Sequence, residues 1–185
     1  QTKKMPAGQP LHLRIGEIVE VRSEAEILAT LDETGELDGL PFMPEMVAWC
    51  GRRLRVDKLA LKLCDTIEWT GMYRIRDTVH LEASRCDGQA HGGCQTGCSL
   101  YWKEAWLKPI TADMPSAPPE PSDSSNNVSL EVLERAVRRV PGPNGEERFF
   151  CQATELLRAA PKRIRFLELG QYIADLQSGN VRLRA

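Results

Sequence analysis

The sequence lacks any apolar run that approaches the roughly 18 residues a membrane-spanning helix requires. Its opening residues, QTKKMPAGQP, include basic side chains but lack the apolar central segment of a secretory signal peptide. Neither export nor anchoring in a bilayer is therefore indicated. We expect a cytoplasmic protein that has no membrane among its partners.

A strong excess of positive charge is also missing. The chain has 24 Lys and Arg against 26 Asp and Glu, which gives a formal net charge of −2. General nucleic-acid binders usually carry a marked basic excess, so we expect a protein partner, such as a redox enzyme, rather than a nucleic acid. The basic segments GRRLRVDK (51–58) and YRIRD (73–77) are either ordinary solvated strand faces or a dock for an acidic partner.

The chain divides at residues 112–127, ADMPSAPPEPSDSSNN, which are rich in proline and serine and have no apolar pattern. We interpret this segment as a linker. It separates a β-rich domain, 11–111, from a small α+β part, 128–185. The hydrophobic content of 42% is enough for a packed core.

The spacing of apolar residues predicts the elements of each part. Alternation predicts a strand in GEIVEVRS (16–23), and we interpret RRLRVDKLALKL (52–63) and DTVHLEAS (77–84) as strands with mixed faces. A capping box of Ser23 and Glu26 predicts a short helix directly after the first strand. Helical spacing in SLEVLERAVRRV (129–140) and LELGQYIADLQSGN (167–180) predicts two helices in the second part. The predicted fold class is α+β and β-rich.

Cysteine is present in unusual number. The six cysteines are Cys50, Cys64, Cys86, Cys94, Cys98 and Cys151. An even count suits three disulfides in a secreted protein, whereas in a cytosolic protein it is typical of a metal or catalytic site. Since nothing in the sequence supports export, we favour a metal site.

The segment CDGQAHGGCQTGC (86–98) holds three of these cysteines, one histidine and four glycines. Ligands must converge on one point, about 2.3 Å from a zinc ion in the case of sulfur. Glycine allows the tight turns that bring loop cysteines together. A cysteine on the preceding strand can complete the set. The predicted ligands are Cys64, Cys86, Cys94 and Cys98, with His91 and Cys50 as further candidates.

The spacing leaves the identity of the metal open. Structural zinc sites usually use two closely spaced cysteine pairs, and here only Cys94 and Cys98 form such a pair. Irregular spacing with a distant fourth cysteine suits an iron–sulfur cluster, which we expect first, with zinc as the alternative and a metal-free site as the third. Cys151, beside two phenylalanines, is interpreted as a buried core thiol.

Two resemblances bear on these expectations. GEIVEVRS followed by CGRRLRV and DTVHLEA resembles a small SH3-like barrel with an insertion after its first strand, over residues 15–85. The motifs LDGLPFMPEM, CGRR, RDTVHLE, the CDGxAHGGCQxGC loop and WKEAWLK resemble a set of uncharacterised bacterial cysteine-rich proteins. The second resemblance implies a shared site and no particular activity.

Three functions follow as hypotheses. The first is an iron–sulfur protein that serves electron transfer or an accessory role in a bacterial redox pathway. The second is a zinc-stapled interaction module without catalysis. The third is an enzyme with a reactive cysteine activated by His80 or His91, for which the sequence offers the residue types but no recognisable pairing motif.

Overall fold

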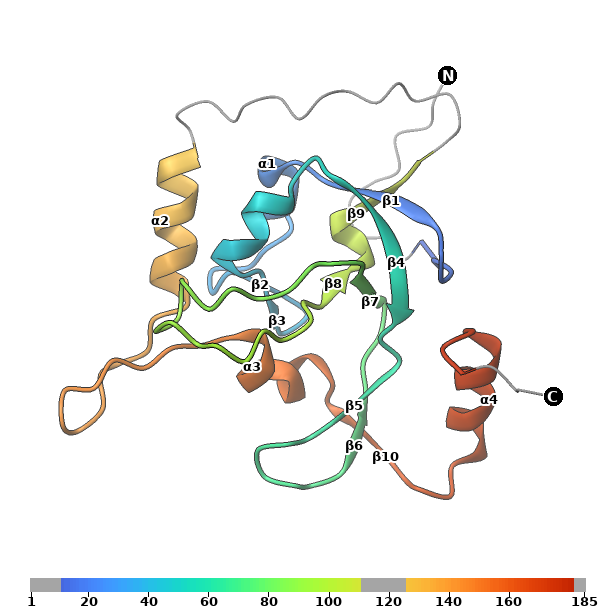
Figure 1. Ribbon diagram of the computed structural model, residues 1–185. Coiled ribbons are helices and arrows are strands. Elements are labelled where there is room, and N and C mark those ends of the chain that lie inside the picture. The colour runs from blue at the N-terminus through green and yellow to red at the C-terminus, as the bar shows by residue number, and fades with distance from the viewer. Residues whose placement is uncertain (1–10, 111–125, 182–185) are drawn as a thin grey trace.

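The structure, a computed structural model, describes residues 11–110 and 126–181. Its main sheet has five strands in the order β8–β7–β4–β1–β9, and all neighbouring strands are antiparallel (Figure 1). The bounds are Ile18–Val21 for β1, Arg53–Leu59 for β4, Thr78–Leu81 for β7, Trp102–Lys103 for β8 and Leu107–Pro109 for β9. Strands are confirmed in all three predicted segments, but residues 52–63 divide between β4 and a separate strand, β5 (Lys62–Cys64), which lies in another sheet.

The order of the strands leaves the sheet open. β9 returns to pair with β1, where Val21 lies opposite Leu107. The described strands form no closed barrel. The part of the chain that the structure describes is a mixed α/β protein with antiparallel sheets and short helices, which confirms the predicted class but not its barrel form.

The segment between β1 and β4 carries four short elements, and one of them supplies a residue of the candidate site. They are α1 (Glu24–Leu28), β2 (Glu36–Leu37), β3 (Leu40–Pro41) and the 3-10 helix η1 (Pro44–Trp49). The predicted capping box of α1 is confirmed, since Ser23 Oγ accepts from Glu26 N and Glu26 Oε2 accepts from Ser23 N. Pro44 starts η1, where a missing N–H costs nothing.

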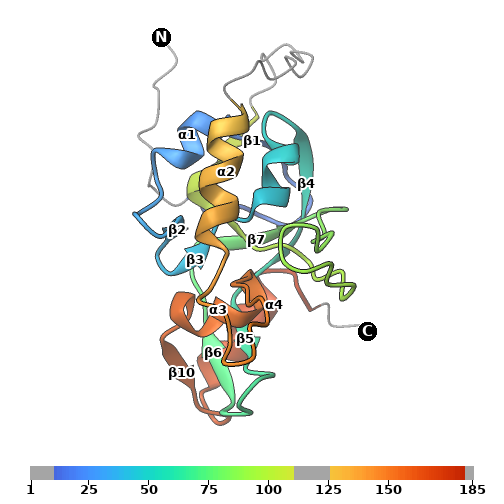
Figure 2. The same cartoon turned by 90° about the vertical axis from the view of Figure 1, so that its left-hand side faces the viewer.

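The second part of the chain completes a sheet that the first part begins. Strand β10 (Lys162–Ile164) pairs with β6 (Met72–Arg74), which in turn pairs with β5 (Lys62–Cys64). The helices of this part are α2 (Asn126–Ala136), α3 (Gln152–Ala159) and α4 (Leu169–Gln177), and a further 3-10 turn, η2 (Glu104–Trp106), precedes β9. α2 packs on η1 and α3 on β3, and α2 runs along the face of the first part in Figure 2.

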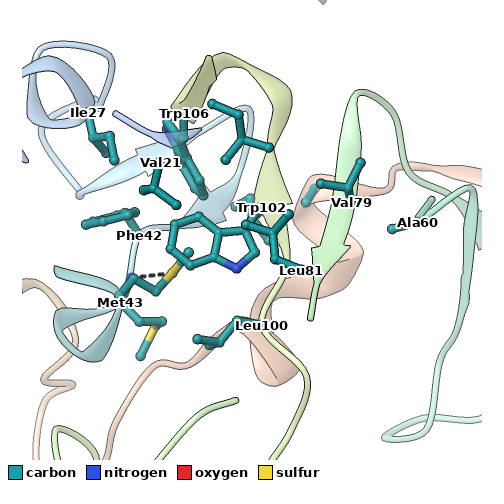
Figure 3. Close-up of a cluster of buried hydrophobic side chains, with 14 of the residues drawn as sticks. Val21, Ile27, Phe42, Met43, Ala60, Val79, Leu81, Leu100, Trp102 and Trp106 are labelled. Atoms are coloured by element: carbon teal, nitrogen blue, oxygen red, sulfur yellow. Dashed lines mark hydrogen bonds between the residues drawn. The ribbon is translucent and has the colours of Figure 1, made fainter. Parts of the chain in front are cut away.

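A cluster of large buried side chains fixes the insertion to the main sheet. The Phe42 ring makes edge-on contacts with Trp106 and Trp102, at centroid distances of 5.2 and 6.3 Å. Ile27 and Val21 close the cluster from α1 and β1 (Figure 3). Since buried aromatic side chains contribute large areas to a core, this packing holds η1 in a fixed position over the sheet.

Candidate metal centre

The cysteine-rich segment begins and ends as a pair of antiparallel backbone runs. Arg85 and Ser99 form a β-bridge. On one side of it Cys86 N donates to Cys98 O at 2.9 Å, and on the other side Leu100 N donates to Ser84 O at 3.2 Å. Residues 87–97 are therefore a closed loop whose two ends are held at Cys86 and Cys98.

Inside the loop the chain folds back on Gly88. A Cβ atom there would lie 1.9 Å from the carbonyl oxygen of Cys94, and φ of Gly88 is +72°. The carbonyl of Gly88 accepts hydrogen bonds from His91 N at 3.3 Å and Gly93 N at 3.0 Å. This position requires glycine, because any side chain would collide with backbone and the positive φ disfavours one. The turn directs His91 inward.

Three potential ligands meet where the loop covers η1. Cys86 Sγ lies 3.1 Å from His91 Nε2, and the same nitrogen lies 3.5 Å from Glu45 Oε1. One ligand atom from each residue lies within 4.8 Å of the other two. The side chains of His91 and Glu45 are 6% and 4% exposed. A carboxylate, a thiol and an imidazole therefore face a common point below the surface.

The electrostatics of this group are unbalanced. Both carboxylate oxygens of Glu45 are buried and accept no hydrogen bond from an N–H or O–H group within the described part of the chain. Burial, followed by a hydrogen bond to the Glu45 carboxylate and by its charge, raises the pKa of the Cys86 thiol to about 12. Buried carboxylates are nearly always paired or bound to a metal.

The structure brings only part of the predicted ligand set to this point. Of the four predicted thiolates, Cys86 alone belongs to the group found among the described residues. Cys98 is half-buried and lies opposite Cys86 across the bridge. Cys94 is exposed, and its sulfur lies 3.2 Å from Thr96 Oγ1. Hydrogen bonds with the side chain and the backbone of Thr96 lower the pKa of the Cys94 thiol. Cys64 is exposed on β5, with its sulfur 3.8 Å from the carbonyl of Asp65.

The remaining cysteines have different surroundings. Cys50 packs against the core, and its burial, followed by the nearby Glu24, raises the pKa of its thiol to about 12. Cys151 directly precedes α3 and is half-buried. Burial, then the neighbouring Cys151 and Cys94, raise the pKa of the Cys98 thiol. Cys151 is therefore a neighbour of the loop, which the sequence did not suggest.

One side chain explains how the second part of the chain reaches the loop. Gln152 Oε1 accepts from Tyr101 N at 2.8 Å, while Gln152 Nε2 donates to Tyr101 O at 2.9 Å and to Pro41 O at 3.0 Å. The buried amide thus acts as a short strand partner for Tyr101 and holds the preceding Cys151 close to the end of the loop.

His80 has a structural role outside this group. Its Nδ1 lies 3.0 Å from Leu100 O, and its ring packs against that of Tyr101 at a tilt of 59° with a centroid distance of 4.4 Å. Burial lowers the pKa of His80. Of the two histidines considered as activators of a cysteine, His91 is the one whose ring contacts a thiol.

Three arginines of the basic segments pair with acids of the same chain. Arg55 pairs with Glu82 at 3.6 Å and Arg74 with Glu168 at 3.0 Å. Arg53 lies 3.5 Å from Glu20 on the adjacent strand. These arginines have local partners, as an ordinary solvated face would provide.

Glu45 is the residue that the sequence analysis missed. It lies in FMPEMVAWCG, where it is the one acidic residue of an apolar run. An acid enclosed by apolar neighbours is a candidate for a buried polar role, because ionised side chains are seldom buried without a partner. That signal was present, but only packing shows which loop Glu45 faces.

Comparison of the chain with family models, curated protein sequences and solved structures gave no match. No helix among the described residues is long and apolar enough to cross a membrane.

A pocket of about 360 Å³ lies between the two sheets and α4. It is lined by residues such as Lys62, Ile75 and Asp175 and includes no member of the Glu45–Cys86–His91 group. The group is therefore the part of the structure that offers a defined chemistry.

Proposed function

We propose that the protein binds one divalent transition metal, zinc in the first instance, through Glu45, Cys86 and His91. The observation that carries this proposal is the buried Glu45 carboxylate, which accepts no hydrogen bond from an N–H or O–H group and approaches the same imidazole nitrogen as Cys86 Sγ. A cation at the centre would neutralise the carboxylate and the thiolate together.

The way in which His91 is approached favours a metal over a catalytic relay. In a nucleophile–His–acid triad the nucleophile contacts one ring nitrogen and the acid the other. Here Cys86 and Glu45 both approach Nε2 of His91. Three donor atoms within 4.8 Å of one another, two of them at the same ring nitrogen, fit a coordination site better than a relay.

The donor types favour zinc. Zinc takes sulfur, nitrogen and carboxylate oxygen in one tetrahedral site. In such a site adjacent ligand atoms lie about 3.5 Å apart, since each is about 2.0–2.3 Å from the ion. The 3.1 and 3.5 Å separations around His91 Nε2 are close to that value. A buried site of this kind supports the hypothesis of a zinc-stapled module, in which the metal fixes the loop to η1.

An iron–sulfur cluster is the second candidate, and a separate observation favours it. The neighbouring thiols of Cys94 and Cys151 raise the pKa of Cys98. Cys98 in turn raises the pKa of Cys86. Four thiolates are the usual ligands of such a cluster. In this cluster Cys151 would be a ligand in place of Cys64. We propose electron transfer to a redox partner as the role of such a cluster.

We also propose that the main sheet is an SH3-like barrel that is incompletely closed. Two features support this: β9 follows a 3-10 turn, and it pairs with β1 so that the last strand of the sheet adjoins the first. The insertion between β1 and β4 then corresponds to the insertion expected from the resemblance.

The test is the metal content of protein purified without oxygen. Colourless protein with one zinc per chain supports the first candidate; brown protein with iron and sulfide replaces it with the second. Protein that binds neither overturns both. Glu45→Ala and His91→Ala should each weaken zinc binding by about 100-fold or more, because losing an outer partner of a ligand alone typically costs about 10- to 100-fold.

The variant Cys64→Ser tests whether the metal is held by the Glu45–Cys86–His91 group or by the four predicted thiolates. Its sulfur is exposed on β5, so the variant should bind zinc as the unchanged protein does. Loss of the metal in Cys64→Ser, with binding retained in Glu45→Ala, would contradict the assignment to Glu45, Cys86 and His91.

A further inference from the structure

Cys86 and Cys98 are direct cross-strand neighbours. The hydrogen bonds Cys86 N to Cys98 O and Leu100 N to Ser84 O flank the Arg85–Ser99 bridge. Residues opposite each other in such a pair have Cα atoms about 5.5 Å apart and project their side chains from the same face. The Cys98 thiol is therefore on the side of the backbone from which Cys86 reaches Glu45 and His91.

This position gives Cys98 access to the metal. Its sulfur lies outside the group whose atoms are within 4.8 Å of one another, but rotation about a single side-chain bond can move it toward Cys86. Zinc is almost always four-coordinate in structural sites, and the group supplies three donors. Cys94 contacts Thr96 at the exposed end of the loop, which leaves Cys98 as the better placed thiol.

The same geometry suits a disulfide. A Cα separation of about 5.5 Å is within the usual range for a disulfide bond. Arg85 Nη1 donates to Gly97 O at 2.9 Å, which fixes the backbone directly before Cys98.

We propose that Cys98 is the fourth ligand of the metal held by Glu45, Cys86 and His91, and that peroxide releases this metal by joining Cys86 to Cys98 in a disulfide. This inference rests on the proposed zinc site. It makes the site a redox-sensitive staple: when the two sulfurs leave the metal, the loop is freed from Glu45 on η1, while the disulfide keeps the two ends of the loop together.

The chemistry balances with hydrogen peroxide as the oxidant. The Cys98 thiolate attacks one peroxide oxygen, an S–O bond forms, the O–O bond breaks, and the departing hydroxide takes a proton to become water. The Cys86 thiolate then attacks Cys98 Sγ, the S–S bond forms, the S–O bond breaks, and the second hydroxide takes a proton. Two thiolates lose two electrons, peroxide becomes two waters, and zinc leaves unchanged as Zn²⁺.

The experiment loads the full chain with zinc and adds hydrogen peroxide. Free zinc is followed with a chromophoric chelator, free thiols are counted, and disulfide-linked peptides are identified by mass spectrometry. We expect release of one zinc with loss of two thiols, a peptide linking Cys86 to Cys98, and recovery of binding after reduction. Cys98→Ser should weaken zinc binding by about 100-fold, whereas Cys64→Ser, which removes an exposed thiol, should not.

The outcomes separate this inference from the proposed function. If the unchanged protein binds zinc and loses it in His91→Ala, but Cys98→Ser binds and releases zinc as before, the zinc site stands and the role of Cys98 is overturned. A disulfide between Cys98 and Cys151 in place of the one between Cys86 and Cys98 also overturns the role of Cys98. This measurement uses the unchanged protein, so it does not depend on whether a variant folds. Absence of zinc from the unchanged protein overturns both proposals.

Discussion

The carboxylate of Glu45 lies 3.5 Å from Nε2 of His91, although one residue comes from η1 and the other from the cysteine-rich loop. Both side chains are almost completely buried, and the Glu45 oxygens accept no hydrogen bond from an N–H or O–H group among the described residues. A purely structural acid would be satisfied by such donors. Here the nearest partners are the imidazole of His91 and the thiol of Cys86.

Glu45→Gln should therefore change the metal-free and metal-bound proteins in opposite directions. Without metal, removal of an uncompensated buried charge should raise the free energy of unfolding by about 1 kcal/mol. With zinc present, the variant should be less stable than the unchanged protein because a ligand is lost. Urea denaturation with zinc and with a chelator measures both values. Glu33→Gln, at an exposed position, is the matched control, and a loss of stability under both conditions would mean that Glu45 has a structural role alone.

Gly88→Ala should destroy the loop, whereas Gly93→Ala should only strain it. Both glycines have similar φ values, +72° and +70°, but a Cβ at Gly88 meets the backbone of Cys94 while one at Gly93 meets nothing within 4 Å. The strain of a left-handed residue alone costs about 1–2 kcal/mol. We expect Gly93→Ala to keep zinc binding and Gly88→Ala to lose it while circular dichroism shows the fold intact. Equal zinc affinity in the two variants would contradict the described loop.

Gln152→Ala should loosen the second part of the chain from the first. It removes the bonds to Tyr101 and Pro41 and leaves their backbone groups unpaired in a buried place. A loss of about 3 kcal/mol in the free energy of unfolding is expected, since each unsatisfied buried group costs about 1–3 kcal/mol. Gln177→Ala, at an exposed position on α4, should change stability by less than about 0.5 kcal/mol. Comparable losses in both variants would rule out this docking role.

Glu26→Gln should show a pH-dependent loss of stability. Burial alone would raise the pKa of Glu26, but Lys108 and hydrogen bonds from Ser23 lower it from 4.5 to about 2. A carboxyl whose pKa is lower in the folded state stabilises the protein above its unfolded pKa. That stability is lost as the pH falls from about 4.5 to about 2.

At neutral pH the variant should be less stable by about 1 kcal/mol, because the pair with Lys108 is partly solvated. Glutamine can still accept the capping hydrogen bond, so the change isolates the charge. Urea denaturation at pH 7 and at pH 3 measures it. A difference between the variant and the unchanged protein that does not shrink at the lower pH would contradict the assigned pKa.

The local elements could be predicted because their signals lie within a few residues. Alternation of Val19 and Val21 with Glu20 identified β1, and Ser23 with Glu26 identified the start of α1. The composition of the Glu45–Cys86–His91 group could not be predicted in the same way. Cys64 was selected for its place on the preceding strand, but β5 pairs with β6 in the second sheet. Strand pairing, which is nonlocal, decides where that sulfur lies.

The sequence by itself determined that residues 86–98 form a glycine-dependent loop rich in sulfur, because glycine spacing and cysteine content are local properties. The tertiary structure alone decided what the loop faces. Packing of Phe42 against two tryptophans holds η1 in place and buries Glu45. His91, the ligand candidate ranked below the cysteines, lies at the centre of the group because the turn at Gly88 points it inward. Burial and convergence depend on contacts between distant residues, and these exist only once the chain has folded.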